Sequence, residues 1–419
     1  MRLSFFRALA YVSCVTFLPA YDPKSVLAAP PESGLVDVTV EDLNAATSRR
    51  SVAPEHETPI RIAKRSIQAI PPNKVDLKSV DKIESTPTRQ LDYTGRPMEP
   101  LQLTETVRQL KPSLERTLRH YFQDTEVARG RSNWGMMHAV LVFGKDTQVI
   151  ANNRRYSTIA WVAGNNICRG QRFFDEDSHG IKVKDGPGLQ GHQGQFLMVC
   201  GLTGVPSRYP LYVNGNKYTI EDLIRREQAD CRTGEELTFA FTGLIHYLDT
   251  DATWTSSDGQ RWDFERLIAE ELSQPVIGAA CGGTHRLMIL SHALRIRRAE
   301  GKPITGQWAR AQQFLDDFVQ YALTLQNRDG SWSTNWFAGR GDNGSIDRKI
   351  QTTGHIVEWL LTTLPNTQLQ DPSLVRGVSF INSAMYQGRD HEWSIGPKGH
   401  ANRALRLFYE RVYRSGSAW

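Results

Sequence analysis

Two patterns of apolar residues alternate along residues 103–413. In the first, an apolar residue recurs every three or four positions, which is typical of an amphipathic helix. This pattern covers 103–121, 156–163, 218–230, 262–273, 308–325 and 373–385. In the second, nearly every face is apolar, which is typical of a buried helix. This pattern covers 136–143, 195–202, 237–248, 287–294, 356–364 and 401–408.

The alternation predicts an all-α fold over residues 101–419. Six amphipathic and six buried helices in turn are the pattern expected of an (α/α)6 toroid, in which an outer ring of helices encloses an inner one. Strand-like alternation is scarce, and 217–220 is the one short piece that we expect to be extended.

The first hundred residues have a different character. Arg2 and Arg7 flank the start, an apolar stretch follows, and Ala28 ends a small-residue motif, so 1–28 resembles a secretory signal peptide. Residues 29–100 are rich in proline and show no sustained period, which predicts a disordered linker. We therefore expect an exported protein of the periplasm, cell envelope or extracellular space, with no stable membrane span after signal cleavage. A retained N-terminal anchor is the alternative.

Composition narrows the function classes. The 419 residues carry a net charge of +5 with no run of Lys or Arg, which argues against a nucleic-acid partner. Four cysteines follow the predicted signal peptide: Cys168, Cys200, Cys231 and Cys281. Four in a chain of this length do not make a disulfide scaffold, although one disulfide of undetermined pairing is compatible with export.

The histidines follow a register. With 33 glycines in 419 residues, about two of the 11 histidines would follow a glycine one or three residues later by chance, whereas His391 and six others do. The six are His138, His192, His246, His285, His355 and His400, spaced 39 to 70 residues apart. Five of them open a predicted buried helix, and His246 lies later in its segment. The spacing is about one helical hairpin, which indicates a degenerate internal repeat.

A toroid would bring these histidines together, because the N-termini of all inner helices meet at one rim. Helix N-termini disfavour imidazolium, so histidines there should stay neutral, as metal ligation or base catalysis requires. We therefore predict catalytic roles for His138, His192, His355 and His400. The alternative for each is a helix cap or a satisfied core histidine.

Cys281 and His285 stand four residues apart at the start of one predicted buried helix, and His355 opens the next. Thiolate and imidazole suit Zn²⁺, and a catalytic zinc needs three protein ligands and an open position. Cys281, His285 and His355 are the predicted metal ligands, with zinc as the candidate cofactor and His138 or His400 as further candidates.

A second set of residues suggests polysaccharide cleavage. Arg172, Asp175 and Asp177 lie on the long connection 164–190, where a cation and carboxylates could act on a glycan. Trp134 and Trp336 could stack on sugar rings. These five are the predicted substrate-binding residues. The alternative is a solvated acidic loop and tryptophans that pack between hairpins.

The stretch from Gln326 to Trp332 resembles the Q-x-x-D-G-S-W repeat of the squalene cyclase and protein prenyltransferase superfamily. A second copy begins at Gln387, and Asp258-Gly259 resembles a third, decayed copy. The resemblance implies an α/α toroid, in which this motif is structural. The superfamily's acidic D-x-D-D and D-D-x-x-D motifs are missing here.

Protein prenyltransferases hold zinc with Asp, Cys and His at inner-helix starts. Cys281 and His355 look similar, and His285 would stand in for the missing Asp. Three functions remain open: a metal-assisted enzyme, a polysaccharide lyase or hydrolase, and a non-catalytic glycan- or peptide-binding scaffold of the cell envelope. The substrate would be a small molecule or a glycan.

Overall fold

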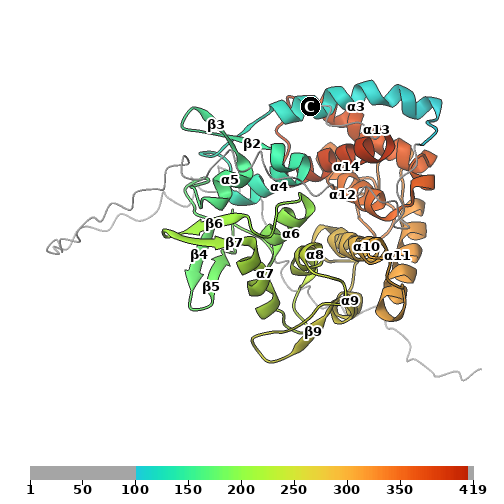
Figure 1. Cartoon of the computed structure of the whole chain (residues 1–419). Helices are drawn as coiled ribbons and strands as arrows, with labels where there is room; N and C mark the ends of the chain where they lie inside the picture. Colours follow the sequence, from blue (N-terminus) through green and yellow to red (C-terminus); the bar gives the residue numbers. More distant parts are fainter. Residues whose placement is uncertain (1–100, 414–419) are drawn as a thin grey trace, which may run out of the picture. The chain divides into compact units, whose positions relative to one another are not determined.

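The computed structural model describes residues 101–413 (Figure 1). The predicted signal peptide and the whole predicted linker lie outside them. The described part is mostly helical, as predicted. Its α-helices are α3 (Glu105–Gln123), α4 (Asn133–Phe143), α5 (Thr158–Ala163), α6 (Gln195–Leu202), α7 (Ile220–Ala229), α8 (Thr238–Tyr247), α9 (Phe264–Ser273), α10 (Thr284–Ala299), α11 (Gly306–Thr324), α12 (Ile346–Thr363), α13 (Pro372–Gln387) and α14 (Ile395–Tyr413).

The even-numbered helices are those whose sequence is apolar on nearly every face. They pack in chain order, α4 on α6, α6 on α8, α8 on α10, α10 on α12 and α12 on α14, and α14 returns to contact α4. Figure 1 shows α8, α10 and α12 side by side in the middle of the fold. Because each buried helix faces two others, its apolar faces have little contact with water.

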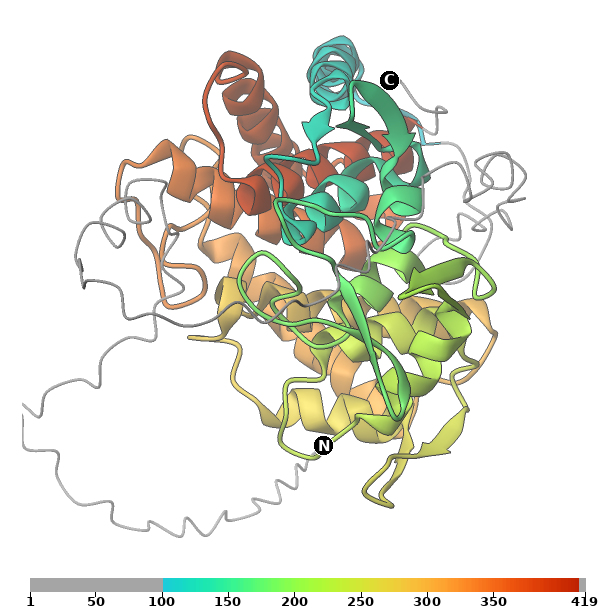
Figure 2. The same cartoon turned by 90° about the vertical axis from the view of Figure 1, so that its left-hand side faces the viewer.

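The odd-numbered helices lie against this set, and all of them except α5, whose six residues are all buried, are amphipathic. Helix α3 packs on α13 and α14, so the first helix lies beside the last two (Figure 2). Helix α11 packs on both α9 and α10. Every helix predicted from the apolar pattern is present, and α6 has the predicted bounds. Side-chain caps such as Ser132 and Asp263 fix several of the starts.

Short strands correct the all-α prediction. The described residues contain β1 (Glu126–Val127), β2 (Gln148–Ala151), β3 (Arg154–Ser157), β4 (Phe174–Asp177), β5 (Gly180–Val183), β6 (Pro210–Val213), β7 (Asn216–Thr219), β8 (Thr253–Thr255) and β9 (Arg261–Asp263). They form antiparallel hairpins, with β1 added in parallel to β2. Two to four residues are too few for alternation to stand out. The expected extended piece at 217–220 is mostly β7.

Three of the hairpins lead straight into an odd-numbered helix. The last residue of the hairpin caps that helix each time: Ser157 caps α5, Thr219 caps α7 and Asp263 caps α9. Asp258 and Gly259 form the turn of the β8–β9 hairpin, with φ +81° at Gly259. They lie within this hairpin, whereas Asp329 and Gly330 lie between α11 and α12.

The motif at Gln326 ties its loop to a neighbouring helix. Gln326 donates to the carbonyls of Gly330 and Ser373, the second of which lies in α13. The Trp332 indole is fully buried and donates to the carbonyl of Ala322 in α11. Within the described residues, no helix has the length and apolar character needed to cross a membrane.

Candidate metal centre and its cavity

Cys281 is held in a tight left-handed turn just before α10. Cys281, Gly282 and Gly283 have φ of +49°, +64° and +75°. A side chain on Gly282 would come within 2.4 Å of the Trp336 indole, and one on Gly283 within 2.5 Å of the Val276 carbonyl. Only glycine fits at these two positions. Backbone held this way costs free energy and is common at functional sites.

Cys281, His285 and His355 are brought together by this turn. Their candidate ligand atoms all lie within 4.8 Å of one another, and they are the one such cluster of His, Cys, Asp or Glu found in the described residues. Cys281 comes from the turn, His285 from the first turn of α10 and His355 from the third turn of α12. The residues predicted as ligands therefore do lie together.

His355 is anchored through one nitrogen only. Its Nδ1 lies 2.7 Å from the Gln351 carbonyl, which can only accept, so Nδ1 carries the proton and Nε2 the lone pair. Nε2 is buried and has no hydrogen-bond partner among residues 101–413. A fixed ring with a free lone pair is the state that metal ligation requires.

The start of α10 is fixed by an ion pair behind it. Arg286, next to His285, lies 2.9 Å from Glu271 of α9, and both side chains are buried. Arg286 also donates to the Gln274 side chain and the Pro275 carbonyl in the loop that leads to Cys281. This pair therefore holds together the two segments that carry Cys281 and His285.

His400 forms a buried dyad with Glu358. Its Nδ1 lies 2.6 Å from Glu358 Oε2, and Arg403 Nε lies 2.7 Å from the other carboxylate oxygen. Burial raises the pKa of Glu358, and the charge of Arg403 opposes that rise. The His400 ring stacks on His355, with 3.7 Å between centroids, and lies 5.3 Å from His285. The dyad is thus packed directly against two of the candidate ligands.

His138 and His192 lie beside the cluster formed by His285, His355 and His400. His138 Nδ1 donates to the Trp134 carbonyl at 2.8 Å, and its ring lies 5.6 Å from that of His400. His192 Nδ1 lies 2.6 Å from Glu236, and its ring stacks on Phe239, whose edge meets His285. The structure therefore assembles all four histidines that were predicted to be catalytic.

Two details of the histidine prediction were wrong. Helix α12 begins at Ile346 and α14 at Ile395, so His355 and His400 lie one to three turns inside their helices. Their first turns are polar, which concealed the true helix starts. His246 lies in the last turn of α8, beside His292 of α10, and not with the other histidines.

Burial controls the charge of the clustered histidines and of Cys281. It lowers the pKa of His138, His285, His355 and His400 and raises the pKa of the Cys281 thiol to about 12. The expected neutral imidazoles are supported, but the main cause is loss of water and not the helix dipole.

A cavity of about 40 Å³ adjoins the centre. Its lining combines polar side chains such as His138, His285, His400 and Glu358 with apolar ones such as Met137, Met198 and Met288. A few polar groups in a largely apolar cavity are typical of a small-molecule site.

No family model, curated protein or solved structure matches the chain. The likeness to the cyclase and prenyltransferase superfamily therefore rests on the sequence motif alone.

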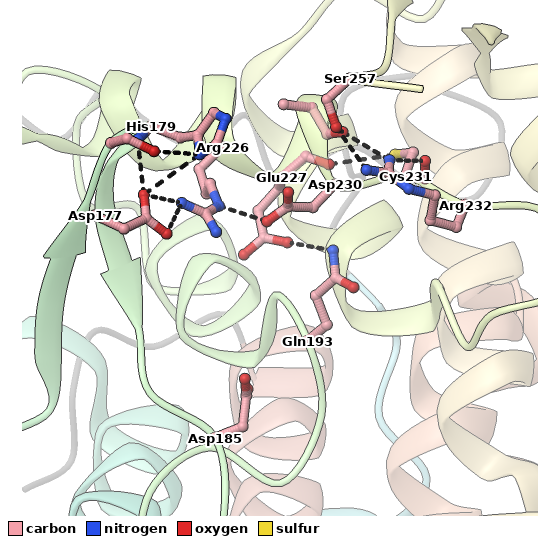
Figure 3. Close-up of polar contacts among 12 residues, drawn as sticks. Asp177, His179, Asp185, Gln193, Arg226, Glu227, Asp230, Cys231, Arg232 and Ser257 are labelled. Atoms are coloured by element: carbon pink, nitrogen blue, oxygen red, sulfur yellow. Dashed lines mark hydrogen bonds and ion pairs between the residues drawn. The ribbon is translucent and has the colours of Figure 1, made fainter. Parts of the chain in front are cut away.

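The acidic residues predicted to act on a glycan have other partners. Both oxygens of Asp177 accept from Arg226, which also pairs with Asp230 (Figure 3). Asp175 accepts from the backbone of Glu176, and Arg172 donates to the Asn165 carbonyl. Their contacts in the described residues are with their own loop and with α7, not with the histidines.

The two predicted stacking tryptophans lie against the histidines instead. Trp134 packs on His138 with 4.1 Å between ring centroids. Trp336, with φ +54°, meets His355 edge-on at 5.4 Å and carries the Arg348 guanidinium over its ring. Both are only partly buried. They are walls of the histidine group.

Sequence reasoning missed the charged partners Glu236, Glu358 and Arg403. Glu358 and Arg403 each stand three residues after a histidine inside an apolar segment, and a charge in such a segment is the signal that could have found them. All four cysteines of the described residues are free thiols. The disulfide considered from the sequence is therefore not formed among them.

Proposed function

We propose that the chain is an exported (α/α)6 toroid that binds one zinc ion through Cys281, His285 and His355 and acts as a metal-assisted enzyme. The cyclic order of contacts among α4, α6, α8, α10, α12 and α14 supports the toroid. The Gln326 motif, which joins one hairpin to the next, supports it as well.

One observation carries the metal assignment. Three donor atoms of the types that zinc prefers lie within 4.8 Å of one another, and one of them, His355 Nε2, is buried without a partner in the described part of the chain. Ligand atoms around a tetrahedral zinc are roughly 3.5 Å apart at the usual bond lengths. A side-chain movement of about an ångström would therefore close the three donors on the ion.

Three protein ligands leave a fourth position for water or substrate, as in catalytic zinc sites. Zinc bound there lowers the pKa of a water molecule or polarises a carbonyl, which suits hydrolysis or group transfer. His400 is oriented by Glu358 through Nδ1, so its Nε2 is left free beside the centre. This is the arrangement of a histidine base held by a carboxylate.

Metal analysis of the purified full-length chain tests this function. We expect one zinc per chain in the wild type and none in the Cys281→Ala/His285→Ala variant. A Cys200→Ala/His391→Ala variant changes the same residue types outside the cluster and should keep its zinc. Circular dichroism checks that both variants fold. Absence of stoichiometric metal, or equal metal in both variants, would overturn the proposal.

The glycan-cleaving alternative has no comparable support. Its carboxylate Asp177 is occupied by Arg226, and no contact in residues 101–413 joins Asp175 or Asp177 to the histidines. A binding-only role is the outcome if zinc is bound but no hydrolase or transferase activity accompanies it.

A further inference from the structure

Arg348 lies beside the metal centre, on the same face of α12 as His355 and two turns before it. Its guanidinium carbon is 5.2 Å from the centre of the Trp336 ring, and the same ring meets His355 at 5.4 Å. Burial is the main influence on the pKa of Cys281 and of His355, and the charge of Arg348 is close enough to act on both. Arg348 therefore belongs to the surroundings of the proposed metal ligands.

The side of the centre where Arg348 lies is accessible to solvent. Cys281, Trp336 and Arg348 are all partly exposed, whereas His355 is buried. A ligand from solution can therefore approach the centre on the side that Trp336 and Arg348 flank.

The guanidinium of Arg348 is fixed along one edge and free along the other. Its Nε donates to the Thr334 carbonyl at 2.8 Å, and its Nη1 donates to the Gln351 side chain at 2.7 Å. The other three of its five N–H groups, on Nη1 and Nη2, have no hydrogen-bond acceptor among residues 101–413. An edge held in this way can form two parallel hydrogen bonds to the oxygens of a carboxylate.

No carboxylate of the described residues pairs with Arg348. Its sequence neighbour Lys349 holds both Asp329 and Asp342, at 2.8 and 2.7 Å. Asp347, on the other side of Arg348 in the sequence, bonds a histidine of the loop before α14. These three acidic side chains are therefore engaged elsewhere.

The position of Arg348 is unfavourable for a cation. Burial lowers its pKa, and it stands in the first turn of α12, where the helix dipole disfavours a positive charge. Arg286 and Arg403 are also buried, but each faces a carboxylate, at 2.9 and 2.7 Å. Arg348 lacks this compensation, and an anionic ligand would supply it.

We propose that Arg348 binds a carboxylate group of the substrate while another group of the same molecule reaches the zinc. A single guanidinium matches the single charge of a carboxylate, whereas a phosphate monoester carries about −1.5 to −2 charges. Trp336 contacts both Arg348 and His355, so it lines the path between the two binding points. This inference rests on the proposed zinc function and names carboxylate-bearing molecules as its substrate class.

Monohydroxamates of dicarboxylic acids provide the probe, because the hydroxamate binds zinc and the carboxylate is left to reach Arg348. Isothermal titration calorimetry on the zinc-loaded full-length protein would compare succinic, glutaric and adipic monohydroxamates with butano-, pentano- and hexanohydroxamate. The second series carries a methyl group in place of the carboxylate. We expect the carboxylate probe to bind about tenfold tighter in at least one of these pairs, as hydrogen bonds between charged groups predict.

The Arg348→Met variant should lose this preference and keep its zinc and its affinity for the neutral probes. Arg348→Lys keeps the charge but not the two parallel donors, so it should retain part of the preference. Arg340→Met removes an exposed arginine of the connection that leads to α12. It is the matched control and should keep the full preference.

Equal affinity within every pair for the zinc-loaded wild type, or a preference unchanged in Arg348→Met, would overturn the inference. Loss of zinc from both Arg348 variants would mean that Arg348 holds the metal ligands in place, and would overturn it as well. Absence of zinc or of any hydroxamate binding in the wild type would instead overturn the proposed function.

Discussion

Two groups of histidines are held in opposite ways. At the metal centre, His138 and His355 donate Nδ1 to carbonyl oxygens and His400 Nδ1 bonds Glu358, so these rings are fixed. Away from it, the rings of His246 and His292 meet, and His246 Nε2 is buried without a hydrogen-bond partner within residues 101–413. Anchored rings suit an ion that requires fixed geometry, and a ring without such a bond lacks that support.

The largest effect on stability should come from replacing Glu358, which holds His400 beside the metal centre. Glu358→Gln leaves Arg403 buried without its carboxylate, which we expect to cost about 3–5 kcal/mol of unfolding free energy. Urea denaturation measures this loss. The Glu358→Gln/Arg403→Met double variant should recover part of it, because the uncompensated charge is then gone. A single variant within about 1 kcal/mol of wild type would show that the dyad does not hold this end together.

Glu227 of α7 provides the contrasting carboxylate. It is also buried, but among the described residues only Gln193 bonds its side chain, and burial raises its pKa to about 7 (Figure 3). The folded state therefore holds a proton that the unfolded state releases near pH 4.5, so Glu227 lowers stability as pH rises from about 4.5 to 7. Glu227→Gln should raise stability by about 2–3 kcal/mol at pH 8 and have little effect near pH 4.

Denaturant midpoints measured across this pH range check the prediction for Glu227. Glu221→Gln, on the exposed side of the same helix, is the control and should change stability little at any pH. A gain for Glu227→Gln that is the same at pH 4 and pH 8 would exclude the ionisation of Glu227 as its cause.

A smaller loss of stability should follow from changing the turn that carries Cys281. Gly282→Ala places a methyl group against Trp336 at a left-handed position, which we expect to cost about 1–2 kcal/mol and to weaken zinc binding at least about tenfold. Gly278→Ala is the matched control, since Gly278 also has positive φ but open space around it. Competition with a chelator measures the affinity. Equal weakening in both variants would mean that contact with Trp336 is not important.

The smallest effect on stability should come from His246, which lies away from the metal centre. His246→Leu removes a buried nitrogen that has no partner, so it should raise stability by about 1 kcal/mol or leave it unchanged, with zinc content unaffected. Thermal denaturation with and without added zinc checks this. A loss of more than about 2 kcal/mol would indicate that His246 has a bonded structural role like that of His400.

Much of the helical architecture could be predicted, because a buried helix needs apolar residues on every turn. The segment 195–202 coincides with α6, since an all-apolar stretch of that length has one way to avoid water. The strands were missed because pieces such as β8 are too short to show a period. The starts of α12 and α14 were placed too late because helices can begin with a polar turn that leaves no apolar signal.

The metal cluster could be predicted from spacing, whereas its neighbours could not. Cys281 and His285 are four residues apart, and His355 recurs one hairpin later in the same register. Glu236, which holds His192, comes from the loop before α8, where nothing in the sequence distinguishes it from a solvated carboxylate. Asp177 was predicted to bind a glycan because its partner Arg226 lies 49 residues away, so their pairing leaves no local signal in the sequence.

X-ray absorption at the zinc edge of the metal-loaded full-length protein tests the central claim most directly. We predict one sulfur neighbour at about 2.3 Å together with nitrogen or oxygen neighbours at about 2.0–2.1 Å. The sulfur should disappear in Cys281→Ser. A zinc environment of nitrogen and oxygen alone in the wild type, or the failure of the protein to retain zinc at all, would contradict the assignment of Cys281, His285 and His355 as a metal centre.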